Sequence, residues 1–298
     1  VKALSGAQAK ALVTTNVTAL NSDQLASINT AAVATLTTDQ VVALTTAQVD
    51  KLTTGQVTAL TSAQVSAMET ADLNKLTSDQ VGAITTASLR GLSTDQVSKL
   101  GTTQLTALTT GQVASMTTAS VSALTTAQTV SLATDQVAAL TTAQVRAVTT
   151  SGIAKLTTDQ VLALTTDAVV ALSTAQAAAL TSAQVVAMTT AQLVQMGTSD
   201  FAALGTSAIA ALTVDQAVKL TTDQVVALTT DQAAKLSSDA VSVLNSAQIR
   251  AFETADLAQL STTAVATITT AALSGLTTTQ ISKMTTGQMA GLTTDQVA

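Results

Sequence analysis

The sequence predicts an all-α protein, a solenoid or superhelix built from very short helices with one helix in each eight-residue repeat. The first observation is a strict period. From Leu4 to Leu292 every eighth residue is Leu, Ile, Met, Val or Phe, at 37 positions without an insertion or deletion. The second is a pair of hydroxyl residues after most of these apolar residues. The third is the fixed place of the charged residues within the repeat, which follows the polarity of a helix.

Each repeat, here called an octad, is read from its apolar residue, position 0. Residues 220–228 are typical and read L-T-T-D-Q-V-V-A-L. Positions 1 and 2 are mostly Thr or Ser, and position 4 is Gln in 24 of the 37 octads. Position 5 is a second apolar residue, position 6 varies, and position 7 is mainly Ala or Lys. Positions 0 and 5 are therefore the predicted core.

Two other secondary structures fit this pattern less well. In a continuous helix, eight residues at about 100° each overshoot two turns by roughly 80°, so the apolar stripe would spiral around the helix. A β-solenoid is the alternative that the Thr and Val content favours. However, positions 0 and 5 differ by an odd number and would lie on opposite faces of a strand. A β-solenoid also needs frequent turn residues, and the chain has 12 Gly and no Pro.

The charges favour helices independently. Twelve of the sixteen Asp residues lie at position 3, and seven of the nine Lys residues lie at position 7. An acidic first turn and a basic last turn complement the helix dipole. A strand offers no reason for this arrangement.

The hydroxyl residues are predicted to begin the helices. Thr221 and Gln224 stand three residues apart, as in the S/T-x-x-E/Q capping box, which makes position 1 the expected N-cap. Position 2 would then be the first helical residue. All three Asp residues at position 4 follow an unusual position 1, in the pairs Glu69–Asp72, Gly197–Asp200 and Glu253–Asp256. This suggests that positions 1 and 4 are coupled.

Such helices of about six residues are too short to be stable alone, so stability must come from stacking of neighbouring octads. Two buried aliphatic side chains per octad contribute about 1.5–3 kcal/mol each. Because the phase is never broken, residues 1–298 are predicted to form a single continuous octapeptide-repeat solenoid. We expect it to be a window of a longer array.

Composition excludes several functions. The chain has no Cys, His, Trp, Tyr or Pro, so it cannot build a disulfide framework, a common zinc site or a His-dependent catalytic triad. We predict no enzyme activity, no catalytic, cofactor-binding or metal-binding residues, and no cofactor. Position-3 Asp residues could form a calcium ladder, but dipole compensation explains them better. Met at position 0 is interpreted as core filling. The net charge of −6 disfavours nucleic acid, and no transmembrane segment is visible.

The L-T-T-x-Q-V-x-A pattern resembles the Ala/Thr-rich octapeptide-repeat arrays of large secreted or surface proteins of Gram-negative bacteria, over the whole chain. The resemblance implies an extracellular or cell-surface location. The predicted function is structural: a stalk, filament, sheath or surface-layer component. The expected partner is the protein itself, as a homopolymer or lateral assembly, or the cell envelope. The alternative is a binding solenoid or adhesin region that displays one face to a glycan, a peptide or a surface.

Overall fold

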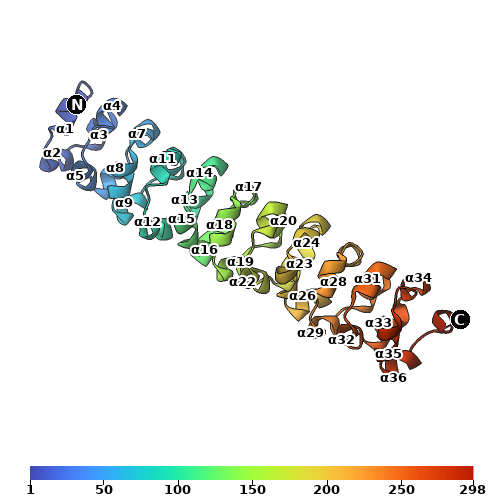
Figure 1. The fold of residues 1–298 in the computed structure, drawn as a ribbon. Coiled ribbons are helices and arrows are strands. Elements are labelled where there is room, and N and C mark those ends of the chain that lie inside the picture. The colour runs from blue at the N-terminus through green and yellow to red at the C-terminus, as the bar shows by residue number, and fades with distance from the viewer. Residues whose placement is uncertain (298) are drawn as a thin grey trace. The chain divides into compact units, whose positions relative to one another are not determined.

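The computed structural model describes residues 1–297, whose regular structure is entirely helical (Figure 1). There are 37 helices, one in each octad, and each is four to six residues long. No β-strand occurs in the described range. The prediction of an all-α array with one very short helix per octad is therefore confirmed, and the β-solenoid alternative is wrong.

The chain divides into two compact units, Val1–Val148 and the residues from Thr149 onward. The helices of the first unit are α1 (Gly6–Lys10), α2 (Thr14–Thr18), α3 (Ser22–Ala26), α4 (Thr30–Val33), α5 (Thr38–Val42), α6 (Thr46–Val49), α7 (Thr54–Ala59), α8 (Ser62–Ala67), α9 (Thr70–Leu73), α10 (Ser78–Gly82), α11 (Thr86–Leu89), α12 (Thr94–Lys99), α13 (Thr102–Thr106), α14 (Thr110–Ser115), α15 (Thr118–Ser122), α16 (Thr126–Ser131), α17 (Thr134–Ala138) and α18 (Thr142–Ala147).

The second unit begins at Thr149, directly after the first, and keeps the same repeat. Its helices are α19 (Thr150–Lys155), α20 (Thr158–Ala163), α21 (Thr166–Val170), α22 (Thr174–Ala178), α23 (Ser182–Ala187), α24 (Thr190–Gln195), α25 (Thr198–Ala202), α26 (Thr206–Ala210), α27 (Val214–Ala217), α28 (Thr222–Val226), α29 (Thr230–Ala233), α30 (Ser238–Ser242), α31 (Ser246–Ala251), α32 (Thr254–Leu257), α33 (Thr262–Thr267), α34 (Thr270–Leu273), α35 (Thr278–Lys283), α36 (Thr286–Ala290) and α37 (Thr294–Val297). That residues 1–298 form one continuous solenoid remains a prediction.

Position 1 begins each helix as its N-cap. In α28, Thr221 is extended (φ −74°, ψ 157°), and its hydroxyl accepts the backbone N–H of Gln224 at 3.1 Å. The Gln224 side-chain oxygen in turn accepts the Thr221 backbone N–H at 3.2 Å. The predicted capping box is therefore confirmed, and position 2 is the first helical residue. Where the cap is Gly101, which has no side chain to accept, its N–H still reaches Gln104 Oε1 at 2.9 Å.

The helices end without help from glycine. After α20 the chain turns through two extended residues, Leu164 (φ −59°, ψ 135°) and Thr165 (φ −68°, ψ 158°). No residue among 1–297 has a positive φ. Because every octad reverses direction in conformations open to ordinary residues, the fold needs neither frequent Gly nor Pro.

The helix dipole explains the acidic residues better than the basic ones. Position-3 Asp residues such as Asp39 and Asp223 lie in the first turn, as predicted. Among the position-7 lysines, three lie in a last turn: Lys99, Lys155 and Lys283. Lys51, Lys75, Lys219 and Lys235 lie beyond the end of shorter helices. The expected six-residue length and its basic last turn therefore hold for only some of the octads.

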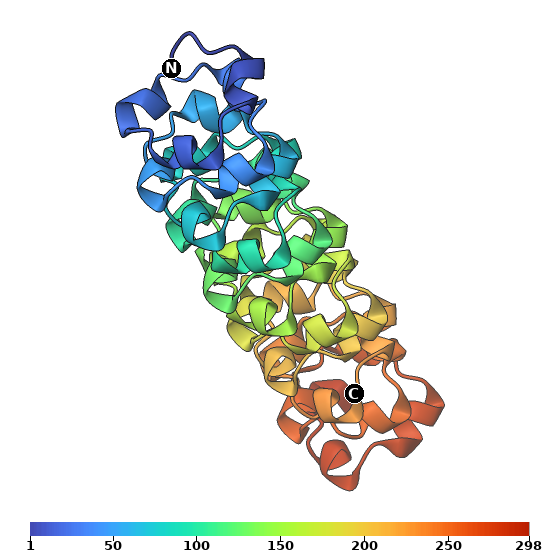
Figure 2. The same cartoon turned by 90° about the vertical axis from the view of Figure 1, so that its left-hand side faces the viewer.

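Within each unit the helices stack in coiled layers, which Figure 2 shows for the blue to green residues. A helix packs against the helix three octads later, for example α15 against α18 and α30 against α33. Side chains also reach four octads back. Gln56 Nε2 donates to the Leu25 carbonyl, 31 residues earlier, whereas Thr58 Oγ1 donates to the Ala83 carbonyl, 25 residues later. One turn of the coil therefore takes between three and four octads.

The core consists of positions 0 and 5, as predicted. Val161 is 1% and Leu164 is 5% exposed, and the same positions are buried through most of both units. Neighbouring layers lie close together at position 7. At Gly275 a Cβ atom would clash with the Ser246 backbone of the preceding layer. The core is thus a narrow column of aliphatic side chains without a wide interior.

Candidate functional surfaces

The most regular polar feature is a buried glutamine at position 4. In α7, Gln56 is 1% exposed, and its Oε1 accepts the Thr53 backbone N–H at 2.9 Å. Its Nε2 donates to the carbonyl oxygens of Leu25 at 2.7 Å and Ile28 at 2.9 Å. One side chain therefore caps its own helix and binds the layer four octads earlier.

This contact recurs along both units and is called the glutamine ladder below. Its members each donate to the carbonyl 28 residues earlier; they are Gln40, Gln48, Gln56, Gln64, Gln80, Gln96, Gln104, Gln112, Gln128, Gln136, Gln144, Gln184, Gln192, Gln216, Gln224, Gln232, Gln248, Gln280, Gln288 and Gln296. A typical hydrogen bond contributes about 0.5–1.5 kcal/mol net, and a buried polar group left unpaired costs about 1–3 kcal/mol. The ladder therefore fixes which carbonyl meets which octad.

The sequence pattern predicts the capping box at positions 1 and 4. It does not predict the glutamine ladder between layers. A signal was nevertheless present. A capping box accepts Glu as well as Gln, yet the two glutamates of the chain, Glu69 and Glu253, both lie at position 1. Only the amide also carries N–H groups, which the layer below requires. The absence of Glu from position 4 therefore indicates that a buried side-chain N–H donor is required there.

Where position 4 is not Gln, a different side chain makes some of the contacts between layers. Ser88 Oγ donates to the Leu60 carbonyl at 2.8 Å, which keeps the 28-residue contact with a shorter side chain. Asp200 has no N–H to donate, and its Oδ1 instead accepts the Thr174 hydroxyl at 2.9 Å. The caps before the three position-4 aspartates make no side-chain capping bond. The coupling of positions 1 and 4 seen in the sequence therefore has a structural counterpart.

Two of these aspartates, Asp72 and Asp256, have carboxyl groups with raised pKa values. Asp72 is 4% and Asp256 is 2% exposed. Burial raises the pKa of each carboxyl above its ordinary value, and the nearby Glu69 or Glu253 carboxylate raises it further. Each buried carboxyl therefore binds its proton more tightly than an exposed carboxyl does.

These carboxyls should make the fold respond unusually to mild acid. A folded-state pKa above the unfolded value means that the folded state binds the proton more tightly. As pH falls through the folded pKa towards about 3.8, Asp72 and Asp256 should therefore add stability, which is lost again as pH rises. Denaturant unfolding at several pH values should show that D72N/D256N lacks this gain. The exposed variant D159N is the control, and equal pH profiles for both variants would contradict the assignment.

The position-3 aspartates, which are the other residues that could bind a metal ion, lie apart from one another. Position-3 aspartates such as Asp159 are exposed singly at helix starts. Among residues 1–297 no three His, Cys, Asp or Glu side chains approach closely enough to hold a metal ion. The geometry supports dipole compensation for these acids. Met68, Met116, Met188 and Met196 are 3–7% exposed, as expected for core filling, whereas Met284 is half-buried.

The most distinctive lateral surface lies in the second unit. Six large aliphatic residues occupy position 6 there and are called the aliphatic stripe: Leu162, Val170, Val186, Val194, Val218 and Val226. Five of them are 40–50% exposed. Their helices touch, since α20 packs on α23, α21 on α24, and α24 on α27. The octads of α22, α25 and α26 carry Ala178, Ala202 and Ala210 at this position.

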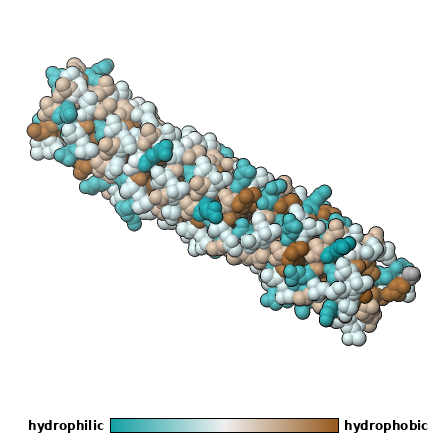
Figure 3. Space-filling model, viewed as in Figure 1, coloured by the Kyte–Doolittle hydropathy of each residue, from teal (hydrophilic) through white to brown (hydrophobic). Residues whose placement is uncertain are grey.

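The ladder connects the remaining members of the aliphatic stripe. The Nε2 atoms of Gln192, Gln216 and Gln224 approach the carbonyls of Leu162, Val186 and Val194 at 3.2, 3.4 and 3.4 Å. Figure 3 shows brown, hydrophobic surface in the region where Figure 1 labels α20 and α24. A shallow hollow of about 250 Å³ lies beside it, lined by Thr190, Ala191, Val194 and Lys219. The stripe is thus a contiguous surface that the sequence alone did not reveal.

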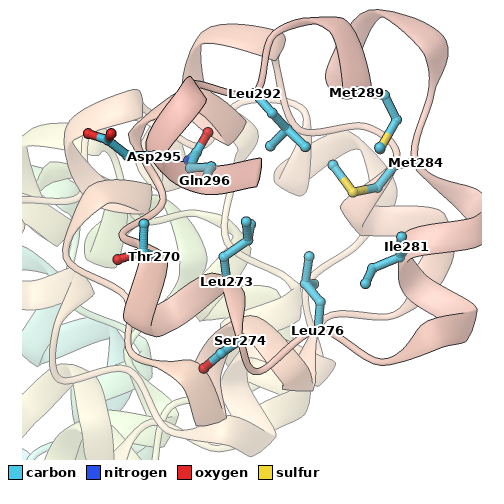
Figure 4. A pocket seen from close by; sticks show the side chains of 10 residues that line it. All are labelled: Thr270, Leu273, Ser274, Leu276, Ile281, Met284, Met289, Leu292, Asp295 and Gln296. Carbon is cyan, nitrogen blue, oxygen red and sulfur yellow. The ribbon is translucent and has the colours of Figure 1, made fainter. Parts of the chain in front are cut away.

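An apolar hollow lies at the end of the second unit. Its volume is about 400 Å³, and Figure 4 shows Leu273, Leu276, Met284 and Leu292 directed towards it. These residues occupy positions 5 and 0, which are buried elsewhere. In residues 1–297 no helix reaches the length and apolar character required of a membrane span.

Comparison with protein families gives a match to the ALTTAQ repeat at residues 17–54, 49–86, 75–110, 137–174, 153–190, 193–230 and 249–286. Residues 139–144 read A-L-T-T-A-Q, which are positions 7 and 0 to 4 of consecutive octads. No curated protein matches the chain. The matched segments cover well over half of the 298 residues. The chain belongs to the ALTTAQ repeat family.

Proposed function

We propose that the chain is a structural repeat protein of the cell surface or extracellular space, a segment of a stalk, filament, sheath or surface layer without catalytic activity. The glutamine ladder carries this proposal. The buried amides bind the layer below, the position-1 hydroxyls cap helices, and the position-3 carboxylates stand singly on the surface. The buried polar groups of the repeat are therefore engaged in capping helices and in holding octads together, and the resemblance to secreted octapeptide arrays supports the location.

The proposal has a mechanism, because octads are interchangeable. Octads with Gln at position 4 offer an amide to the layer below, and Gln56, for example, donates to carbonyls 28 and 31 residues earlier. Solenoid stability is a sum of repeat and neighbour terms, so length can change without redesign of the core. Such a chain can serve as a spacer of adjustable length.

Removal of Thr221–Leu228, one whole octad, should leave folding and surface display unchanged. The ladder spacings are restored by the next octad, and only one step of the coil is lost. Spin labels at S199C and S282C, both exposed and the only thiols then present, should report a shorter and still narrow distance by pulsed EPR.

The matched control removes half an octad, Thr221–Gln224, which places Thr229 and Gln232 at positions 5 and 0, where the core requires apolar residues. It should broaden the distance distribution and lower the melting temperature. If the whole-octad deletion broadens the distribution to the same extent, the octads are not interchangeable and the structural role loses its basis.

The second candidate function is a binding solenoid or adhesin region, and the aliphatic stripe favours it. Exposed aliphatic side chains grouped on one face can contact a partner surface. The double variant V194S/V226S should leave folding intact, because both residues lie outside the core. Loss of one specific binding activity in this variant would favour the adhesin function over the spacer. Unchanged display and binding would favour the spacer.

A further inference from the structure

The exposed large aliphatic side chains of the central octads gather in one stretch of the chain. Between residues 50 and 250, the Leu, Val, Ile, Met and Phe side chains that are at least 40% exposed are Leu162, Val170, Val186, Val214, Val218 and Val226. Five of them belong to the aliphatic stripe. The sixth, Val214, replaces the Thr or Ser that position 2 carries in every other octad after the first.

Val214 extends the aliphatic stripe because of its place on α27. It lies four residues before Val218, and side chains with this spacing share one face of a helix. Its side chain is 43% exposed, so it adds little to the core of its own octad. The loss of the hydroxyl at position 2 thus enlarges an apolar surface that the neighbouring octads already present.

Acidic residues lie beside these aliphatic side chains. In the nine octads from Thr157 to Leu228, each Asp at position 3 belongs to an octad of the aliphatic stripe; they are Asp159, Asp167, Asp215 and Asp223. Each lies three residues before the position-6 side chain, on the same face of its helix. All four are exposed, and none makes an ion pair within residues 1–297. Lys219 is the single basic residue of these octads, so the stripe is bordered by uncompensated negative charge.

The aliphatic stripe has the dimensions of a helix-binding surface. It takes two neighbouring octads from each of three turns of the coil, α20 with α21, α23 with α24, and α27 with α28. Packed helices lie about 8–10 Å apart, so the stripe is roughly 20 Å long. An α-helix of about 14 residues has this length. A helix with aliphatic residues on one face and Lys or Arg at its edges matches both the apolar and the charged parts of this surface.

We propose that the aliphatic stripe docks a cationic amphipathic helix of a partner protein, whose basic side chains lie beside Asp159, Asp167, Asp215 and Asp223. Charge complementarity identifies this occupant. A second copy paired through the same stripe would bring four aspartates against four others, and like charges in an interface oppose association. The inference rests on the second candidate function, the binding solenoid, and names the chemistry of its partner.

Binding of a labelled Leu/Lys peptide to residues 1–298, followed by fluorescence anisotropy, tests the proposal. The peptide has about 14 residues, with Leu on one helical face and Lys on the other. The unmodified protein should bind it, and added salt should weaken the binding, because salt screens exposed charges. D215N/D223N should weaken it about fivefold through the loss of two exposed ion pairs. V218S/V226S should weaken it about tenfold, since less apolar surface is buried.

The matched control is D231N/D239N, which removes the same charge from exposed position-3 aspartates whose octads carry Ala234 and Ser242 at position 6. It should leave the affinity unchanged. Circular dichroism of each variant alone verifies that it stays folded. Equal weakening by both Asp-to-Asn pairs overturns the proposal, because the peptide then responds to net charge alone.

Three further results also overturn it. They are the absence of peptide binding, equal binding of a Leu/Glu peptide of the same pattern, and self-association of the protein that V218S/V226S abolishes while the Leu/Lys peptide does not bind. If the Leu/Lys peptide fails to bind but V194S/V226S abolishes another binding activity, only the cationic partner is wrong and the binding solenoid stands. The octad-deletion test of the structural role is independent of each of these results.

Discussion

Q56E should strongly destabilise the layers around α7, by about 3–5 kcal/mol, although it changes only an amide into a carboxylate. The carboxylate keeps the bond to the Thr53 N–H and loses both donors to Leu25 and Ile28. A charged oxygen then faces two carbonyl oxygens in a site that is 1% exposed. The Ile28 carbonyl loses its donor, whereas the Leu25 carbonyl keeps the backbone N–H of Ile28. The cost therefore combines a buried charge with lost hydrogen bonds.

The matched control is Q8E, which makes the same chemical change at a position-4 glutamine that is exposed and makes only the capping bond. It should change stability by less than about 0.5 kcal/mol. Because a solenoid can unfold locally, native-state hydrogen exchange around residues 25–28 and 53–60 is the appropriate measurement beside the melting temperature. Equal effects of Q56E and Q8E would show that capping alone explains position 4.

The local structure could be predicted from the sequence because it depends on contacts within one octad. The N-cap at Thr221, the helical start at Thr222 and the core residues Val225 and Leu228 all follow from spacing and residue type. The β-solenoid alternative failed on the parity of positions 0 and 5, which strand geometry cannot accommodate. These features repeat along the chain, so many octads support the same prediction.

Contacts between layers could not be predicted because they depend on the small bend that each octad adds. The extended residues at positions 0 and 1, such as Leu164 and Thr165, set this bend through their dihedral angles. Whether Gln56 meets residues three or four octads away follows from the accumulated bend, which no residue type encodes by itself. The buried role of position 4 and the grouping of Leu162 and Val194 into one stripe therefore emerged only in three dimensions.

The assignment of positions 0 and 5 to the core can be tested within the single octad that contains α20. L164D should destabilise the second unit by roughly 3–5 kcal/mol, since Leu164 is 5% exposed and an unpaired carboxylate would replace an aliphatic core contact. V161D should have a similar effect, because Val161 is 1% exposed on the same side of α20. Urea denaturation with a helical readout measures both.

L162D is the control for these variants, since Leu162 lies between them in the sequence and is 50% exposed. It should cost less than about 1 kcal/mol, because its carboxylate stays in water. If L162D is as damaging as L164D, then position 6 is buried in solution, and lateral packing through the aliphatic stripe covers it. The effect of L162D on stability also tests the role of the aliphatic stripe. A silent L162D leaves the stripe free to bind a partner, whereas a costly one that depends on protein concentration identifies the stripe as an interface between copies.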